Sequence, residues 1–431
     1  DDEIYLVGGY LRNYFINKTI SYDRDIVCLR DSYLFAKKLT DKLNATFIEL
    51  DNENKIYRVV LEDKTNYIDV SLALNNDIKQ DAFRRDFTIN SIYYDIKNDK
   101  ILDYTNGIED IKNKIIRTTN LNNILDDPLR LLRLYRFYSI TNFKIEEELS
   151  EFVKNNIEKI NSVAKERINY EIMQIFLSKY LVNTLLKMLE DNVLEYIFPF
   201  VKEVKKIPPN SHHHLDLIHH LIETVNNIRI DNPLLKLAAF YHDIGKPECK
   251  SIEKAGDCTM IHFHGHESIS EKKTIKSMHF LKFSNEEIDK VSHLVKEHMF
   301  YYEPCWSDAA VRRFIIRVGL ENLDDLILVR LADIYGMHGT PLAEGSPVFM
   351  NLAELKKRIE KVIKEKQALG LKDLAVNGQD LIKAGIPSGK KMGSILKELF
   401  EAVTESPQMN DKEKLLEVAK NIWETKYRLT K

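Results

Sequence analysis

The 431-residue sequence lacks the features that mark several protein classes. No apolar run approaches the roughly 18 to 20 residues that cross a bilayer, so we expect no membrane. No secretory signal opens the printed sequence, and no paired metal-ligand spacing of cysteines occurs, which favours a reducing cytoplasm. The four cysteines are Cys28, Cys249, Cys258 and Cys305. The net charge of −3 excludes a uniformly basic protein, so any nucleic-acid contact must come from local patches.

Histidine is absent from the first 211 residues of the chain. All 13 histidines lie at or beyond His212. The length suggests two to four domains, and this asymmetry indicates two chemically different halves.

The first 110 or so residues alternate β-rich runs with polar turns, which predicts an α/β nucleotide-binding domain. The expected strands are Ile4–Val7, Asp25–Leu29, Ala45–Leu50, Tyr57–Leu61, Asn66–Leu72 and Ser91–Ile96, and the expected helices are Arg12–Phe15 and Ser32–Leu43. From about Leu121 onward the apolar spacing is almost entirely helical. Breaks at Pro208–Pro209 and Gly336–Pro347 indicate domain boundaries, and a basic helix follows the second break.

A glycine pair stands between the first strand and the next helix. Gly8 and Gly9 would let the backbone approach a phosphate closely, and Arg12 lies one helical turn further on. Asp23 and Asp25 begin the following strand, where residues i and i+2 face the same side. Two carboxylates that point to one place are costly unless a divalent cation binds between them. Their hard oxygen ligands suit Mg²⁺. Mg²⁺ held in this way serves phosphoryl transfer. Asp69, on a later strand, is a candidate third carboxylate.

These motifs and those after them resemble the class II tRNA nucleotidyltransferase and bacterial poly(A) polymerase family. The matching stretches, in family order, are Gly8–Arg12, Asp23–Asp25, Arg84–Asn90, Asp103–Asp110, Asp127–Phe137 and Lys165–Glu171. The resemblance covers roughly residues 4 to 200. It implies an α+β fold, with a polymerase-β-like nucleotidyltransferase head of mixed or antiparallel sheet, followed by all-α neck, HD and tail domains. We place these domains at residues 1–120, 121–207, 208–340 and 341–431.

The nucleotide-selecting stretch also has a chemical interpretation. Asp127 and Arg130 are three apart on the expected helix, so they share a face, where a carboxylate and a guanidinium could read the base of CTP or ATP. Arg133 and Arg136 continue round that side and could hold the triphosphate. By family analogy Arg85 contacts the nucleotide, assisted by Arg84. A solvated helix with an ion pair is the alternative interpretation.

Two positions depart from the family pattern. Asp126 stands where the family commonly has Glu, which leaves the role of Asp127 intact. Asn106-Gly107 replaces a Gly-Gly hinge, which puts the freedom of the hinge in doubt.

The histidine-rich middle resembles the HD phosphohydrolase superfamily. Imidazoles and carboxylates together can bind a divalent metal, and His220, His242, Asp243 and Asp333 occur in the family's order. His266 and His298 match additional ligands that some members use, whereas we interpret His212–His214 as a polar approach to a helix. The segment Val376–Gly393 resembles the RNA-binding tail of bacterial members, with Lys390 and Lys391 supplying positive charge.

The resemblance implies template-independent, Mg²⁺-dependent addition of CCA from CTP and ATP to the 3′ end of tRNA, releasing pyrophosphate. No obligate protein partner is implied. An A-only adding enzyme or a poly(A) polymerase shares the same motifs. A metal-dependent phosphohydrolase acting on 2′,3′-cyclic phosphates or phosphomonoesters, as main or accessory activity, and a non-catalytic RNA-binding protein remain the alternatives from other classes.

Overall fold

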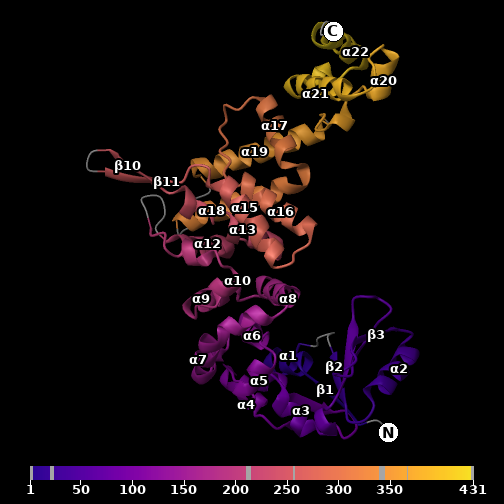
Figure 1. The fold of residues 1–431 in the computed structure, drawn as a ribbon, viewed down its shortest axis with the longest axis vertical. Helices are drawn as coiled ribbons and strands as arrows, with labels where there is room; N and C mark the ends of the chain where they lie inside the picture. The colour runs from indigo at the N-terminus through magenta and orange to yellow at the C-terminus, as the bar shows by residue number, and fades with distance from the viewer. Residues whose placement is uncertain are drawn as a thin grey trace. The chain divides into compact units, whose positions relative to one another are not determined.

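The computed structural model describes residues 3–19, 24–209, 215–255, 258–338, 345–365 and 367–428. The chain forms two compact units (Figure 1). Unit 1 comprises residues 1–202 and 277–283, and unit 2 comprises residues 203–276 and 284–431. No helix among the described residues is long and apolar enough to cross a membrane.

Unit 1 begins with a mixed seven-stranded sheet in the order β3-β4-β5-β2-β1-β6-β7. Its strands are β1 (Ile4–Val7), β2 (Arg24–Cys28), β3 (Thr46–Asp51), β4 (Ile56–Val60), β5 (Tyr67–Leu72), β6 (Ile92–Asp95) and β7 (Lys100–Asp103). Only β2 and β5 pair in parallel, and the other neighbours are antiparallel. The six expected strands are confirmed, with ends that differ by at most one residue, whereas β7 was not expected.

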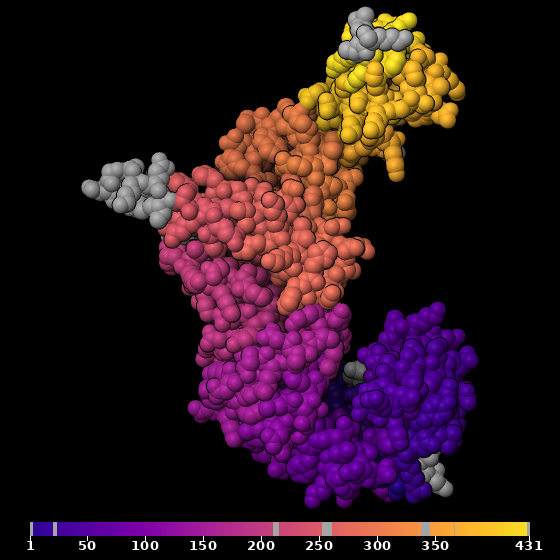
Figure 2. All heavy atoms as spheres, viewed as in Figure 1, coloured from indigo at the N-terminus to yellow at the C-terminus, as the bar shows by residue number. Residues whose placement is uncertain are grey.

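The helices of unit 1 cover the sheet and then continue as a helical region. They are α1 (Gly9–Asn17), α2 (Ser32–Leu43), α3 (Ile78–Arg84), α4 (Gly107–Asn113), α5 (Leu121–Asp126), α6 (Arg130–Thr141), α7 (Glu147–Asn156), α8 (Lys165–Phe176), α9 (Leu181–Glu190), α10 (Leu194–Ile197) and α11 (Val201–Val204), the last of which crosses into unit 2. A two-stranded parallel pair, β8 (Ile115–Ile116) and β9 (Lys144–Ile145), links the two regions. The expected helix Ser32–Leu43 is confirmed. Figure 2 shows a hollow between the sheet domain and these later helices.

The alternation along β2 decides which residues face which side of the sheet. Ile26 and Cys28 are buried in the cluster that packs against α2. Val27 is buried with Ile78 and Ala82 of α3 on the opposite face. Because side chains alternate along a strand, Asp25 shares the face of Val27. Asp69 alternates in the same way with Ile68 and Val70, so both carboxylates lie on the α3 face.

The described part of unit 2 is helical apart from one hairpin, β10 (Ser251–Ala255) with β11 (Cys258–His262), which agrees with the expectation of an almost entirely helical pattern. Its helices are α12 (Leu217–Asn226), α13 (Pro233–Tyr241), α14 (Lys246–Cys249), α15 (His266–Phe280, which ends in unit 1), α16 (Asn285–Glu297), α17 (Asp308–Val318), α18 (Leu323–His338), α19 (Pro347–Lys364), α20 (Gly378–Lys383), α21 (Lys390–Glu405) and α22 (Lys412–Ile422). Short 3₁₀ segments are Leu74–Asn76, Thr88–Asn90, Ile157–Ser162, Leu320–Asn322, Leu371–Asp373 and Pro407–Met409, and Trp423–Arg428 is π-helical.

Gly336 lies inside α18, so the expected break begins later than predicted. A Cβ at Gly336 would stand 2.8 Å from Thr224 Oγ1 of α12. The glycine therefore allows α12 and α18 to approach closely, and these helices carry His220 and Asp333.

Candidate functional site

The turn between β1 and α1 lies directly against Asp25. Gly8 has a φ of 81°, a backbone conformation that L side chains rarely adopt. Val7 pairs with Asp25 across the sheet, and a Cβ on Gly8 would overlap the Asp25 carboxylate. Because Gly8 has no side chain, the Asp25 carboxylate can occupy this space. Asp23 lies outside the described residues, so its expected place beside Asp25 stays a prediction.

Asp69 stands next to Asp25, because the two residues are register partners on the parallel strands β2 and β5. Its carboxylate accepts two hydrogen bonds from Arg58 of β4, at 2.7 Å from Nε and 2.8 Å from Nη2. The guanidinium of Arg58 also lies 3.8 Å from the ring centroid of Tyr67. Sequence reasoning missed Arg58, since the bidentate pair forms only when the strands associate.

Arg85 is a second cation on the same face. Its Nε donates to Tyr93 Oη at 2.7 Å and to Asp81 Oδ2 at 3.2 Å. Burial would lower the pKa of Arg85, but its interactions with Tyr93, Asp81 and Asp25 raise it above the ordinary value. Arg85 is therefore held as a cation within the electrostatic reach of Asp25. Asp81 and Tyr93, both fully buried, are functional neighbours that the sequence did not reveal.

Arg12 is buried and joins the sheet domain to the helical region. Its Nη1 donates to Asn90 Oδ1 at 2.7 Å, and its guanidinium lies 5.0 Å from the ring centroid of Phe137 on α6. Asn90 Nδ2 in turn donates to Asp86 Oδ1 at 3.4 Å. Asp86 completes the chain by accepting from Arg133 of α6 at 2.8 Å. The expected phosphate-binding residue Arg12 therefore has protein partners.

Helix α6 presents a cluster of guanidiniums. Arg133 and Arg136 both approach Glu171 of α8, at 4.0 and 3.2 Å, and both lie within 5.3 Å of the Phe137 ring centroid. Burial raises the pKa of Glu171 despite these arginines. The buried Arg136 Nε and Glu171 Oε2 have no hydrogen-bond partner among the described residues. Such atoms are positions where a ligand or water can bind.

Asp127 and Arg130 do not share a helix face, so that expectation was wrong. Asp127 follows α5 in an extended conformation, and α6 begins at Arg130. The cause is Pro128, because a residue before proline disfavours the helical region. Asp127 Oδ2 accepts from Arg167 Nη2 of α8 at 2.7 Å. Arg130 Nη1 donates to the carbonyl oxygens of Arg84 and Asn123 at 3.1 and 2.8 Å.

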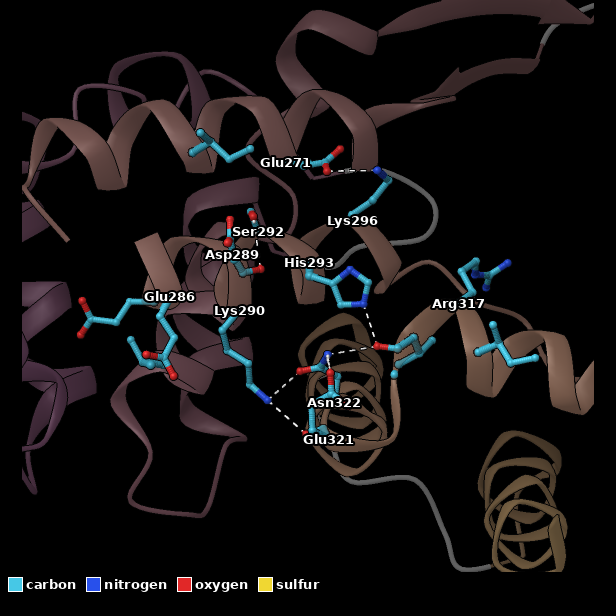
Figure 3. A pocket seen from close by; sticks show the side chains of 16 residues that line it. Glu271, Glu286, Asp289, Lys290, Ser292, His293, Lys296, Arg317, Glu321 and Asn322 are labelled. Atoms are coloured by element: carbon cyan, nitrogen blue, oxygen red, sulfur yellow. Dashed lines mark hydrogen bonds and ion pairs between the residues drawn. The ribbon is translucent and has the colours of Figure 1, made fainter. Parts of the chain in front are cut away.

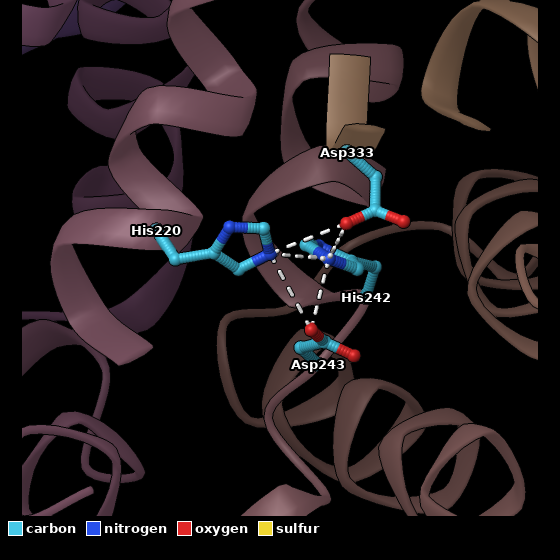
Figure 4. A group of neighbouring side chains, drawn as sticks. All are labelled: His220, His242, Asp243 and Asp333. Atoms are coloured by element: carbon cyan, nitrogen blue, oxygen red, sulfur yellow. Dashed lines mark hydrogen bonds and ion pairs between the residues drawn. The ribbon is translucent and has the colours of Figure 1, made fainter. Parts of the chain in front are cut away.

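The expected HD ligands meet inside unit 2 (Figure 4). The Nε2 atoms of His220 and His242 lie 3.2 Å apart. Asp333 Oδ1 lies 3.3 and 3.4 Å from these two nitrogens, and Asp243 Oδ2 lies 3.4 and 3.2 Å from them. All four side chains are buried. They come from α12, from the turn after α13 and from α18.

A second group shares Asp243. Its Oδ1 lies 2.8 Å from His266 Nε2 and 3.5 Å from His298 Nε2, so each oxygen of this carboxylate faces a different pair of imidazoles. The Nδ1 atoms of three rings lie 2.6 to 2.8 Å from the backbone oxygens of residues three positions earlier, which leaves Nε2 directed at the carboxylates; these rings are His242, His266 and His298. Buried imidazole nitrogens and carboxylate oxygens within 4.8 Å of one another fit a divalent metal ion.

The two buried carboxylates shift the pKa values of the imidazoles beside them. Burial would lower the pKa of His242, but Asp243 and Asp333 raise it to about 10. The pKa of Asp333 is held well below its usual range, against the effect of burial, by hydrogen bonds from His220 and His242. A protonated His242 thus supplies positive charge that a bound cation could supply in its place.

A groove of about 920 Å³ elsewhere in unit 2 contains none of these ligands (Figure 3). Lys290 contacts Asn322 Oδ1 at 2.9 Å, and Lys296 contacts Glu271 at 3.1 Å. His293 Nε2 lies 2.8 Å from the carbonyl oxygen of Val318. Because Lys290, Lys296 and His293 already have protein partners, we assign no chemistry to this groove.

Known families match most of the described fold. Residues 4–117 match the Poly A polymerase head domain, residues 142–205 the Probable RNA and SrmB-binding site of polymerase A, and residues 261–419 a tRNA nucleotidyltransferase domain 2. An A-adding tRNA nucleotidyltransferase of Deinococcus radiodurans is 26% identical over 92% of this chain and 90% of its own. A CC-adding tRNA nucleotidyltransferase of Thermus thermophilus is 24% identical, covering 93% and 89% respectively. The structure of the Bacillus stearothermophilus CCA-adding enzyme in complex with CTP shares the fold, with a TM-score of 0.63 and 18% identity over 98% of this chain and 94% of that one.

Proposed function

We propose that this chain is a tRNA nucleotidyltransferase that builds the CCA end of tRNA from CTP and ATP. One observation carries the proposal: Asp25 lies over the Gly8 turn, with Asp69 beside it in register. Phosphoryl transfer needs carboxylates next to a backbone that a phosphate can approach closely. The nucleotidyltransferases similar to this chain extend over nearly its whole length, which supports tRNA as the acceptor.

In this reaction the 3′-oxygen of the RNA forms a bond to the α-phosphorus of the nucleotide. The bond from that phosphorus to the β-phosphate oxygen breaks, pyrophosphate leaves, and the hydroxyl loses its proton. Asp23 and Asp25 would hold Mg²⁺, which compensates the triphosphate charge when bound. Arg85 contributes a fixed positive charge on the same side of the sheet.

The residues of the helical region have two roles in the proposal. Arg133 and Arg136 hold the triphosphate, because they concentrate positive charge around Phe137 and leave a buried Nε available. Asp127 and Arg130 read the base, although they come from a turn and a helix start rather than from one helix face. We place the activity in the cytoplasm. Three cysteines are free thiols in the structure, and a reducing cytoplasm would keep them so; they are Cys28, Cys249 and Cys305.

The decisive experiment offers tRNA without its CCA end to the protein with labelled CTP, ATP or both, and sequences the products. Addition of CC and then A by one protein supports CCA synthesis. Adenosine added only after a CC end indicates an A-adding enzyme, and long adenosine tails indicate a poly(A) polymerase. No incorporation contradicts the proposal.

Asp25→Asn tests the assignment of the site. We expect it to lower incorporation by at least roughly 100-fold, because a metal ligand contributes several kcal/mol of charge stabilisation. Asp99→Asn is the matched control, since Asp99 on the same domain only accepts a hydrogen bond from Tyr94. Equal activity in the two variants would remove Asp25 from the mechanism.

We propose a second activity for the buried cluster of unit 2, a metal-dependent hydrolysis of phosphate esters. The observation that favours it is the set of imidazole Nε2 atoms aimed at Asp243 and Asp333. In that reaction a water oxygen bonds to phosphorus while the ester P–O bond breaks and the alcohol takes a proton. Hydrolysis of a nucleoside 2′,3′-cyclic phosphate, lost in His242→Ala, would support it. Hydrolysis unchanged in this variant would contradict it.

A further inference from the structure

One row of paired residues crosses the sheet of unit 1 through Asp25. Residues that stand directly opposite each other on neighbouring strands point to the same face of the sheet. From the edge strand β3 to β6, the row contains one residue of each strand in spatial order: Ile48, Arg58, Asp69, Asp25, Val7 and Tyr93. These side chains therefore all lie on the α3 face.

The row has a guanidinium on each side of Asp25. On the β1 side, Arg85 Nε donates to Tyr93 Oη at 2.7 Å. On the β5 side, Arg58 donates to the Asp69 carboxylate at 2.7 and 2.8 Å. Strand β4 lies two strands away from β2, which is roughly 10 Å at the usual strand spacing. Arg58 thus stands about one nucleotide away from the carboxylate proposed to hold Mg²⁺.

Arg58 is held in one orientation and is still reached by solvent. The bidentate pair with Asp69 fixes the plane of the guanidinium, whose centre lies 3.8 Å from the ring centroid of Tyr67. The side chain is nevertheless 30% exposed. Beyond it the row ends at Ile48 on the edge strand, which is 42% exposed. A fixed cation on an open part of the sheet suits a ligand that arrives from solution.

The geometry of nucleotide transfer distinguishes the two sides of the row. The attacking 3′-oxygen and the departing pyrophosphate oxygen stand roughly in line, on opposite sides of the α-phosphorus. The Gly8 turn follows β1, and Arg85 is bonded to β6, so the triphosphate belongs on the β1 side of Asp25. The RNA end then approaches from the β5 side, where Arg58 lies.

We propose that Arg58 binds the phosphate of the last internucleotide linkage of the acceptor RNA and so positions the 3′ end at Asp25. This inference rests on the nucleotide addition proposed above. A guanidinium that pairs with a carboxylate along one edge can donate to a phosphate oxygen along another. Such a contact fixes the position of the RNA strand without reading its bases. Asp69 then has the additional role of orienting Arg58.

The test is a thermodynamic cycle between Arg58 and that linkage. The full-length protein is titrated, with Mg²⁺ and without nucleotide, against tRNA lacking its CCA end, whose last linkage is either a phosphate or a neutral methylphosphonate. We expect the unchanged protein to bind the neutral form roughly tenfold more weakly, the effect of one charge-assisted hydrogen bond. Arg58→Ala should bind both forms equally within twofold, and Arg58→Lys should retain part of the difference. The matched control, Arg30→Ala, should retain all of it, because Arg30 is 81% exposed and pairs with Glu3 only at 3.9 Å.

Several results would overturn the inference. Equal binding of the two RNAs by the unchanged protein excludes the contact, whether or not any variant folds. A tenfold difference that persists in Arg58→Ala assigns the linkage to another residue. If Arg58→Ala raises the KM for CTP and leaves RNA binding unchanged, the residue contacts the triphosphate instead. A fall in kcat alone means that Arg58 only positions Asp69.

The same samples keep this inference separate from the proposed function. Absence of nucleotide incorporation by the unchanged protein would contradict nucleotide addition, whereas the binding cycle does not require turnover and still tests the contact. Circular dichroism of each variant reports that it has folded.

Discussion

At the scale of single residues, Gly8 is the position where the backbone and the candidate chemistry are most tightly linked. We predict that Gly8→Ala abolishes most nucleotide incorporation while the protein stays folded. A methyl group would be strained at a φ of 81° and would overlap the Asp25 carboxylate. A loss of at least roughly tenfold is expected, since strain of this kind costs on the order of 1 to 3 kcal/mol.

The measurement is the initial rate of labelled CTP incorporation, with circular dichroism as the check on folding. Gly393→Ala is the control, because nothing lies within 4 Å of a Cβ at that helical position. Wild-type rates in Gly8→Ala would mean that the turn and the carboxylate are not coupled.

The residues that could be predicted are those whose role is local in the chain. Gly8 and Asp25 were found because a glycine turn and a strand alternation can be recognised within a few positions. The partner Tyr93 could not be found, since it approaches Arg85 only when α3 packs on the sheet. Asp81 lies four residues before Arg85, so this helical pair was open to prediction and was missed. Asp127 was placed on the wrong element because the helical spacing outweighed the effect of Pro128.

At the scale of elements, an ion pair links two segments: Asp86, which follows α3, pairs with Arg133 of α6. Burial would raise the pKa of Asp86, but Arg133 lowers it to about 2. The lowered pKa means that the ionised carboxylate stabilises the fold at pH values above about 4. This contribution is lost as the pH falls from about 4 towards 2, where Asp86 becomes protonated.

We therefore predict that the free energy of unfolding of Asp86→Asn falls less on acidification than that of the unchanged protein. The free energy of unfolding, from urea titrations at pH 6 and pH 3, should fall less in the variant than in the unchanged protein. The difference should be on the order of 1 kcal/mol, because one pKa unit corresponds to about 1.4 kcal/mol. Parallel losses in both proteins would show that Asp86 does not titrate in this range.

The order of elements was predicted better than their ends. The strands up to β6 and the helix Ser32–Leu43 follow from hydrophobic periodicity. The strand β7 was missed because its only apolar residues, Ile101 and Leu102, are adjacent and give no alternation, although the turn at Asp99, with a φ of 52°, precedes it. The meeting of α12 and α18 depends on Gly336, which the sequence suggested as a break rather than a close contact.

At the scale of the whole molecule, the two units carry candidate metal sites of different ligand chemistry. Asp25, in unit 1, offers carboxylate oxygen, a hard ligand that suits Mg²⁺. The cluster of unit 2 offers imidazole nitrogen from His220, His242, His266 and His298, which suits transition metals. Since the two sites lie in separate compact units, their metal requirements should be separable.

We predict that a chelator removes both activities and that Mg²⁺ alone restores only one. After dialysis against a chelator, added Mg²⁺ should return nucleotide incorporation, whereas hydrolysis of a 2′,3′-cyclic phosphate should require Mn²⁺, Co²⁺ or Ni²⁺. The measurement follows both reactions in one preparation at several metal concentrations. Asp25→Asn should fail to incorporate nucleotide with any metal yet keep the hydrolysis, and His242→Ala should behave in the opposite way. If Mg²⁺ restored both reactions equally, the nitrogen ligands of unit 2 would not select the metal.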